Sequence, residues 1–126
     1  MSIATCTFRL IASVLCIGAF VLAGESAVAD DAVTAAGEQY KVEFENEKVR
    51  VLRGTYAPGA KAAMHEHPDA VVFQVTGGHL MMTLANGETV DAEVVAGNVG
   101  WSDATMHEVT NVGDEPLEVI IVELKD

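Results

Sequence analysis

Cysteine and basic residues are scarce in this chain. Its 126 residues include two cysteines, Cys6 and Cys16, and only seven lysines and arginines against 19 acids. The formal net charge of −12 argues against a nucleic-acid partner, because phosphate binding needs a cationic surface. The same charge disfavours docking on an anionic membrane surface. The length suits one domain and leaves no room for a second sizeable core.

Only one long apolar run is present, and it lies at the N-terminus. Residues 10–24 are uncharged and apolar, Arg9 precedes them, and Ala27-Val28-Ala29 follows. A cationic start, an apolar middle and an A-x-A end predict a secretory signal peptide over residues 1–29. The run is shorter than the roughly 20 residues that span a bilayer as a helix. An uncleaved N-terminal anchor is the alternative. After signal removal we expect no stable membrane insertion.

Removal of the signal leaves residues 30–126 without any cysteine. The net charge stays at −12, because Arg9 and Glu25 leave together. No disulfide, cysteine nucleophile or thiolate metal ligand is then possible, although an oxidising compartment would permit a disulfide. We therefore expect an exported, periplasmic or secreted protein that is stabilised by its core alone.

The rest of the chain has no sustained helical apolar period and is rich in short strands. Residues 30–39 are small and polar and predict a flexible leader. Beyond them, eight or nine short apolar segments alternate with turn signals, of which Asn86-Gly87 is the strongest. Tyr40, Val42 and Phe44 alternate with charged residues, which predicts a two-faced first strand. The fold class expected for residues 40–126 is all-β, a small antiparallel β-barrel or jelly roll.

The chemistry is concentrated in three of the four histidines. His65 and His67 are two residues apart, so on an extended strand both rings lie on one face. His107 opens a later strand after a glycine-bracketed turn, and in a small barrel that strand can lie beside the first. Imidazole nitrogens that converge in this way are metal ligands. The sequence therefore predicts a metal site at His65, His67 and His107.

At these residues the chain resembles the cupin superfamily, in particular its small single-domain members. The first cupin motif is matched by Gly59, five residues, His65-Glu66-His67 and later Gly78. The second is matched by Gly97, then His107 and Asn111. The resemblance covers roughly residues 49–123, and it implies a cupin-like double-stranded β-helix. One fold hosts many functions, so it implies much less about activity.

Two departures from the cupin pattern concern the site. Val71 or Val72 stands where the family usually has a metal-binding glutamate, and Asp103-Ala104-Thr105 replaces its P-x-G turn. The resemblance thus implies three histidine ligands without the carboxylate. Three neutral imidazoles suit a divalent transition metal (Fe, Zn, Ni, Cu or Mn) better than Mg or Ca. The missing carboxylate opens a position for water or an anionic substrate.

Several other polar residues are candidates for a supporting role. Gln74 is the nearest candidate to replace the glutamate, although a regular strand with Val71 inward turns Gln74 away. Asp69 or Asp103 is a candidate partner for an imidazole N–H. Arg53 is expected either to hold a substrate carboxylate inside the barrel or to pair with a surface acid.

Two aromatic residues and the fourth histidine are expected to have structural positions rather than a role as metal ligands. Phe73 and Trp101 are expected in the core or in the pocket wall, and His79 on the surface.

Three functions remain open on this evidence. The first is a metal-dependent cupin that binds or transforms a small molecule, with oxidoreductase (dioxygenase-like) and isomerase activities both common in the family. The second is a non-catalytic small-molecule-binding barrel without a functional metal. The third is a structural or interaction protein with relic histidines. The resemblance implies a homodimer in each case.

Overall fold

The computed structural model describes residues 29–126, so all but the last residue of the predicted signal peptide lies outside the described part. The described chain has one short helix and nine strands. Their bounds are α1 Ala32–Ala35, β1 Tyr40–Glu45, β2 Val49–Tyr56, β3 Lys61–His67, β4 Ala70–Gln74, β5 Gly78–Leu84, β6 Thr89–Val94, β7 Val99–Ser102, β8 Thr105–Asn111 and β9 Leu117–Leu124.

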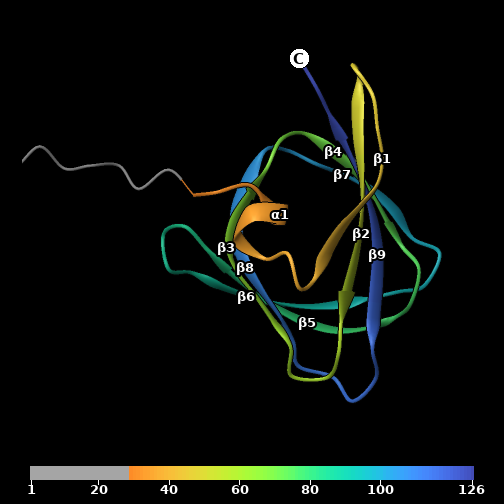
Figure 1. Ribbon diagram of the computed structural model, residues 1–126. Helices are drawn as coiled ribbons and strands as arrows, with labels where there is room; N and C mark the ends of the chain where they lie inside the picture. Colours follow the sequence, from red (N-terminus) through yellow and green to blue (C-terminus); the bar gives the residue numbers. More distant parts are fainter. Residues whose placement is uncertain (1–28) are drawn as a thin grey trace, which may run out of the picture.

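The strands form two antiparallel sheets that face each other (Figure 1). One has five strands in the order β1-β2-β9-β4-β7, and the other has four in the order β3-β8-β5-β6. Sequence neighbours β3 and β4 lie in different sheets, as do β7 and β8, so the chain repeatedly crosses between the layers. This confirms the predicted jelly-roll class. The predicted hairpin at Asn86-Gly87 is confirmed too, with Gly87 at φ +83° between β5 and β6.

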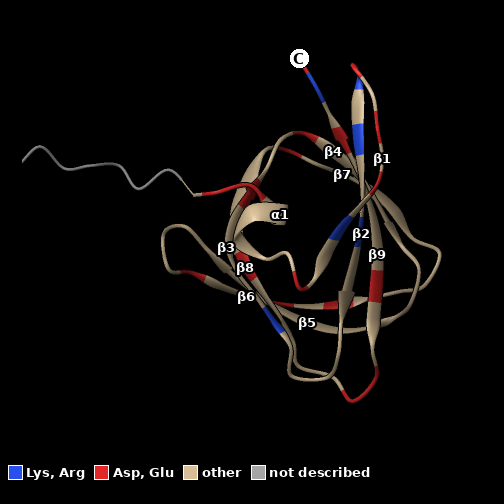
Figure 2. Ribbon diagram, viewed as in Figure 1, with Lys and Arg blue, Asp and Glu red and all other residues tan. Residues whose placement is uncertain are grey.

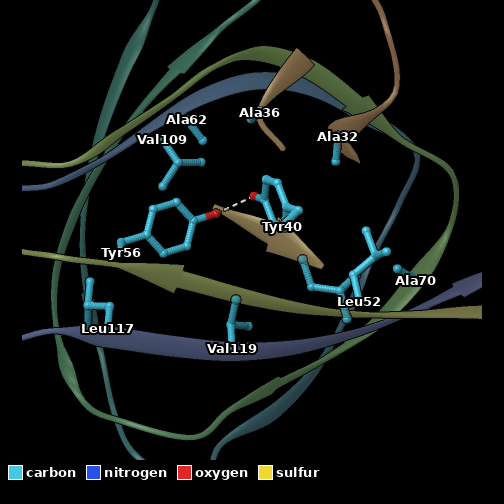
Figure 3. Packing of buried hydrophobic residues seen from close by; sticks show 11 residues of the cluster. Ala32, Ala36, Tyr40, Leu52, Tyr56, Ala62, Ala70, Val109, Leu117 and Val119 are labelled. Carbon is cyan, nitrogen blue, oxygen red and sulfur yellow. Dashed lines mark hydrogen bonds between the residues drawn. The ribbon is translucent and has the colours of Figure 1, made fainter. Parts of the chain in front are cut away.

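The core lies between the sheets and follows the period-two pattern of the long strands (Figure 3). In β9 the residues Leu117, Val119 and Ile121 are buried, and those between them are partly exposed. Leu52 and Tyr56 of β2 share this interior. Alternation of buried and exposed positions is what one face packed on a core requires.

The predicted two-faced character of β1 is wrong beyond its first residue. Tyr40 is buried, but Val42 and Phe44 are exposed. Two features of the strand account for the difference. β1 is the edge of the five-stranded sheet, and a register shift between Val42 and Phe44 breaks its regular alternation.

The predicted flexible leader is replaced by a one-turn helix, α1, packed against the barrel. Asp31 caps it by accepting a hydrogen bond from the Val33 N–H at 3.0 Å. Ala32 is fully buried, and the backbone of Asp30 accepts a hydrogen bond from Glu66 N in β3. A four-residue helix of small side chains has no detectable apolar period, which is why sequence patterning gives no sign of it.

The acidic excess seen in the composition is distributed along the whole described chain (Figure 2). Acidic residues are spread over loops and strands of both sheets, whereas the basic residues are few. Across residues 29–126, no helix has the length and apolar character needed to cross a membrane.

Candidate metal centre

The three predicted histidines come together on two paired strands of the smaller sheet. His65 and His67 lie on β3, and His107 lies directly opposite His65 on β8. Directly opposed residues in antiparallel strands have neighbouring side chains on the same face. His65 and His67 are buried, and His107 is partly buried. The ring centroids of His65 and His107 are 4.9 Å apart, and those of His65 and His67 are 4.8 Å apart.

The outer nitrogen of two of these rings is held by a hydrogen-bond acceptor. Nδ1 of His65 lies 2.6 Å from the carbonyl oxygen of Ala63, and Nδ1 of His67 lies 2.7 Å from Oε1 of Glu123. A carbonyl and a carboxylate only accept, so each imidazole donates from Nδ1. In the neutral form of each ring, the lone pair is therefore on Nε2, toward the barrel interior.

These tautomers leave the inner nitrogens facing each other. Nε2 of His65 and Nε2 of His67 are 3.1 Å apart. Nε2 of His107 is buried and has no hydrogen-bond partner among the described residues. The Tyr40 hydroxyl can donate to only one of these facing acceptors, Nε2 of His65. A buried acceptor that is left without a donor is costly. A metal ion between them would satisfy these lone pairs, so the donor set fits a metal.

The spacing of the donors also fits a single ion. One nitrogen from each histidine can be chosen so that all three lie within 4.8 Å of one another. Transition-metal–imidazole bonds are about 2.0–2.1 Å long, so two nitrogens on one ion lie at most about 4.2 Å apart. A small side-chain rotation is enough to bring the set within the reach of one ion.

Burial favours the neutral form of His65 and of His107. It lowers the pKa of His107 to about 3, and repulsion from His65 and His67 adds to the effect. Burial likewise lowers the pKa of His65. Metals bind the neutral imidazole, so protons compete weakly for these ligands near neutral pH.

A buried carboxylate, that of Glu123, accepts the hydrogen bond from Nδ1 of His67. Glu123 of β9 is almost fully buried, and its second oxygen accepts a hydrogen bond from Arg50 Nε at 2.6 Å. Burial by itself raises the pKa of Glu123, but the bonds from His67 and Arg50 outweigh it and lower the pKa. Arg50 also lies 3.3 Å from Asp31, the cap of α1. This chain of contacts links the short helix to the histidine cluster.

Two tyrosines complete the interior around the histidines. The Tyr40 hydroxyl lies 3.1 Å from Nε2 of His65, and the Tyr56 hydroxyl donates to the Tyr40 hydroxyl (Figure 3). Burial raises the pKa of Tyr40 to about 12 and that of Tyr56 well above its ordinary value. Both phenols therefore stay protonated at neutral pH.

The site opens into a cavity inside the barrel. The cavity has a volume of about 160 Å³, and its wall is mostly apolar, with Val72, Leu80, Met82 and Ile121 among the lining residues. His67, His107 and both tyrosines supply part of its polar lining. Binding pockets for drug-sized ligands hold roughly 300–1,000 Å³. This cavity therefore suits a smaller molecule.

Comparison with known proteins agrees with this fold. No family model and no curated protein matches the sequence. Solved structures do match. The chain is similar to a cupin domain from Bordetella pertussis, with 27% identity and a TM-score of 0.65 over 69% of this chain and 92% of that one. The chain therefore has the double-stranded β-helix fold of the cupin superfamily.

More distant cupin structures share the fold. An uncharacterized conserved protein with a double-stranded β-helix domain from Klebsiella pneumoniae is 23% identical, with a TM-score of 0.55 over 68% of this chain and 70% of that one. An RmlC-like cupin family protein from Methanocaldococcus jannaschii is 16% identical, with the same TM-score, over 68% of this chain and 77% of that one. At such identities the likeness concerns the fold alone.

The cupin motif positions have distinct roles in this chain. Asn111, four residues after His107, is fully buried and donates to the carbonyl oxygens of Tyr56 and Glu115 at 3.0 and 2.8 Å. It ties the end of β8 to the neighbouring turn. At the position of the usual glutamate, Val72 packs on the core and lines the cavity. No carboxylate comes from β4 at this point.

The structure decides the orientation of β4, which the sequence pattern left open, against the alternative with Val71 inward. Ala70 is buried, Val72 and Gln74 line the cavity, and Phe73 is exposed, so the inward positions are the even-numbered ones. Gln74 nevertheless lies away from the histidines. It pairs with Val119, whereas Ala70, four residues earlier, pairs with Glu123 beside His67.

The two aspartates considered as imidazole partners bind elsewhere. Asp69 accepts from Ala104 N at 2.7 Å, and Asp103 accepts from Trp101 Nε1 at 2.9 Å. Both close the turns at the ends of their strands. Arg53 bonds to Glu43 and Glu118, which confirms the surface-pair alternative. His79 is half-exposed and pairs with Asp91, as expected of a surface histidine.

Phe73 and Trp101 are not core residues. They lie on adjacent strands, β4 and β7, and are 40% and 56% exposed. Phe73 occupies an outward position of β4, and Trp101 of β7 pairs with Val71, two residues before Phe73 on the same face of the sheet. Together with Val99 they form an exposed apolar face at the free edge of the five-stranded sheet.

Sequence reasoning missed Glu123, Tyr40 and Tyr56 as parts of the site. Glu123 had a detectable signal, because it is in phase with the apolar residues Leu117, Val119 and Ile121 of the same strand. An acid on a buried face calls for a partner. Nothing in the spacing of the tyrosines indicates that they meet His65.

Proposed function

We propose that this cupin binds a divalent transition metal through His65, His67 and His107 and takes up a small molecule in the adjoining cavity. The observation that carries the proposal is the pair of Nε2 atoms 3.1 Å apart, together with the bonds that hold the protons on the opposite nitrogens. Such an arrangement suits a bound cation better than an empty pocket. The buried, unpartnered Nε2 of His107 adds a third donor.

Three neutral nitrogen donors favour Fe, Zn, Ni, Cu or Mn over Mg or Ca. When bound, such a metal supplies Lewis-acid polarisation of an oxygen atom at its open position. The chain's own residues orient the ligand histidines, exclude bulk water through the apolar wall, and present the Tyr40 hydroxyl to the site. If the protein is an enzyme, the family resemblance favours an oxidoreductase (dioxygenase-like) or isomerase reaction.

Elemental analysis of the purified, untagged protein tests the metal site directly. We expect close to one transition-metal ion per chain in the wild type, and loss of it in His67→Ala. The matched control is His79→Ala, which removes an exposed histidine paired with Asp91 and should retain the metal. Less than about a tenth of an ion per chain in the wild type, unchanged by His67→Ala and by added metal, contradicts the proposal.

A metal-free binding barrel is the second candidate function. The apolar cavity supports it, because Val72 lines the wall at the position of the usual carboxylate ligand. A library of small apolar ligands can be screened against the wild type and a variant with all three site histidines changed to alanine. Retained affinity in the triple variant favours this second function, and lost affinity favours the first.

We further propose export and homodimerisation. The signal pattern of residues 1–29 supports the periplasm or secretion as the location. N-terminal sequencing of the protein isolated from its native host tests this, with Asp30 as the expected first residue. The exposed apolar face of Phe73, Val99 and Trp101 beside the free β7 edge supports pairing with a second copy. Light scattering of the wild type and Trp101→Lys tests it: a dimer that becomes a monomer is expected.

A further inference from the structure

The Tyr40 hydroxyl occupies a position beside the histidine cluster that no cupin motif accounts for. It lies 3.1 Å from Nε2 of His65, which is also the distance between Nε2 of His65 and Nε2 of His67. Tyr40 and Tyr56 are both almost fully buried. A buried phenol this close to a histidine nitrogen has few alternative hydrogen-bond partners, so its neighbours determine the direction in which its hydroxyl donates.

The hydrogen bonds around Tyr40 run in one direction. His65 donates from Nδ1 to the Ala63 carbonyl, so its Nε2 accepts the Tyr40 proton. Tyr56 in turn donates to the Tyr40 oxygen. Each hydroxyl has a single proton, and the order of donation is therefore Tyr56 to Tyr40 to His65.

A metal on His65 would use the same Nε2 lone pair that now accepts from Tyr40. The Tyr40 proton then needs another acceptor close by. The phenol has little freedom to turn away, because its ring packs against Gly54, where a Cβ atom would lie 3.0 Å from Cε1 of Tyr40. Its oxygen is already engaged by Tyr56. Tyr40 packs against both His65 and His67 and lines the cavity, so a group bound beside these histidines is an acceptor within its reach.

We propose that Tyr40 determines which ligand binds at this site. Its hydroxyl donates a hydrogen bond to a small carboxylate bound at the open coordination position. The inference rests on the metal site proposed above. Three neutral imidazole ligands do not compensate the charge of a divalent ion, which favours an anion as the next ligand. The mostly apolar cavity of about 160 Å³ accommodates a short hydrocarbon tail. The expected ligand is therefore a short-chain carboxylate with the tail directed into the barrel.

Binding of butyrate to the Co(II)-loaded full chain tests this role without any assay of activity. The visible spectrum of Co(II) reports both metal uptake and anion binding. We expect butyrate to bind more tightly than acetate, because only its tail reaches apolar wall, and neutral butyramide to bind weakly. Tyr40→Phe should lower butyrate affinity roughly ten-fold or more, since a hydrogen bond to a charged group is lost.

The Co(II) affinity of Tyr40→Phe separates a proton donor from a metal ligand. If Tyr40 is a donor that competes with the metal for the His65 lone pair, Tyr40→Phe should bind Co(II) as tightly as the wild type or more tightly. The control is His79→Ala, which removes an exposed histidine paired with Asp91 and should leave butyrate affinity unchanged. Near-ultraviolet circular dichroism of each variant verifies that the barrel has folded.

The outcomes distinguish this inference from the proposed function. Unchanged butyrate affinity in Tyr40→Phe, with Co(II) bound normally, overturns the role of Tyr40 alone. A large loss of Co(II) affinity in Tyr40→Phe, together with a visible phenolate charge-transfer band in the Fe(III)-loaded wild type, overturns it too, because Tyr40 is then a ligand. Failure of the wild type to bind Co(II) overturns both proposals.

Discussion

Glu123→Gln should abolish most metal affinity although Glu123 is not expected to touch the metal. In the wild type, one oxygen of Glu123 accepts from His67 Nδ1 at 2.7 Å and the other accepts from Arg50 Nε at 2.6 Å. A glutamine offers one acceptor oxygen and one donor NH₂ group. Arg50 can only donate, so it takes the oxygen. The NH₂ group then faces His67 Nδ1.

This substitution reverses the tautomer of His67. To avoid two opposed donors, Nδ1 must accept, and the single proton of the neutral ring moves to Nε2. The lone pair needed for the metal is then on the wrong nitrogen. Changes in such outer partners typically cost about 10–100-fold in metal affinity, or roughly 1.4–2.7 kcal/mol. We expect a loss at the upper end of that range.

The apoprotein should also lose stability, by a moderate amount. Breaking a buried ion pair by removing one charge costs about 3–5 kcal/mol. Here Arg50 keeps Asp31 as a partner, and the glutamine still accepts one hydrogen bond. The free energy of unfolding should therefore fall by roughly 1–3 kcal/mol. Chelator-competition titration measures the affinity, urea denaturation the stability, and ¹⁵N NMR of the histidines the tautomer.

Two controls isolate the tautomer effect. Arg50→Gln leaves the His67–Glu123 bond intact, so stability should fall while metal affinity changes only a few-fold. Glu45→Gln removes an exposed ion pair with Lys125 and should change stability by less than about 1 kcal/mol. Wild-type metal affinity in Glu123→Gln, with the proton still on Nδ1 of His67, refutes this reasoning.

Two further predictions concern packing and pH. Gly54→Ala places a Cβ atom 2.8 Å from Cγ1 of Val119 and 3.0 Å from Cε1 of Tyr40, so the free energy of unfolding should fall by about 1–3 kcal/mol. The control is Gly100→Ala, whose Cβ atom meets nothing within 4 Å. Equal effects of the two substitutions in urea denaturation would contradict the packing argument. The folded-state pKa of His107, about 3, lies below its ordinary 6.5, so the unfolded chain binds more protons between these values and stability falls as pH falls through them. We expect the apoprotein to lose roughly 2–3 kcal/mol between about pH 7 and pH 4.5, and His107→Ala to show a flatter profile in urea titrations; identical slopes would rule out His107 as the cause.

Local sequence pattern and spacing determined the class of this fold and the three histidines of its candidate metal site. The strands could be predicted from the sequence because each is a short apolar segment bounded by turn residues. Asn86-Gly87 defines its hairpin through backbone conformation alone. His65 and His67 share a face because side chains alternate on any extended strand. Only their meeting with His107 needed more, and there the cupin resemblance supplied the pairing of two strands 40 residues apart.

Tertiary structure alone decided which faces are buried and what surrounds the histidines. β4 reads as an unbroken apolar segment, so its pattern does not say whether Val71 or Val72 points inward, and its pairing with β9 settles the matter. Phe73 and Trp101 are exposed for the same reason. The contacts of Glu123 with His67, and of Tyr40 with His65, join residues 56 and 25 positions apart. Each contact depends on the register of two sheets rather than on any local preference, so no reading of a single strand can contain it.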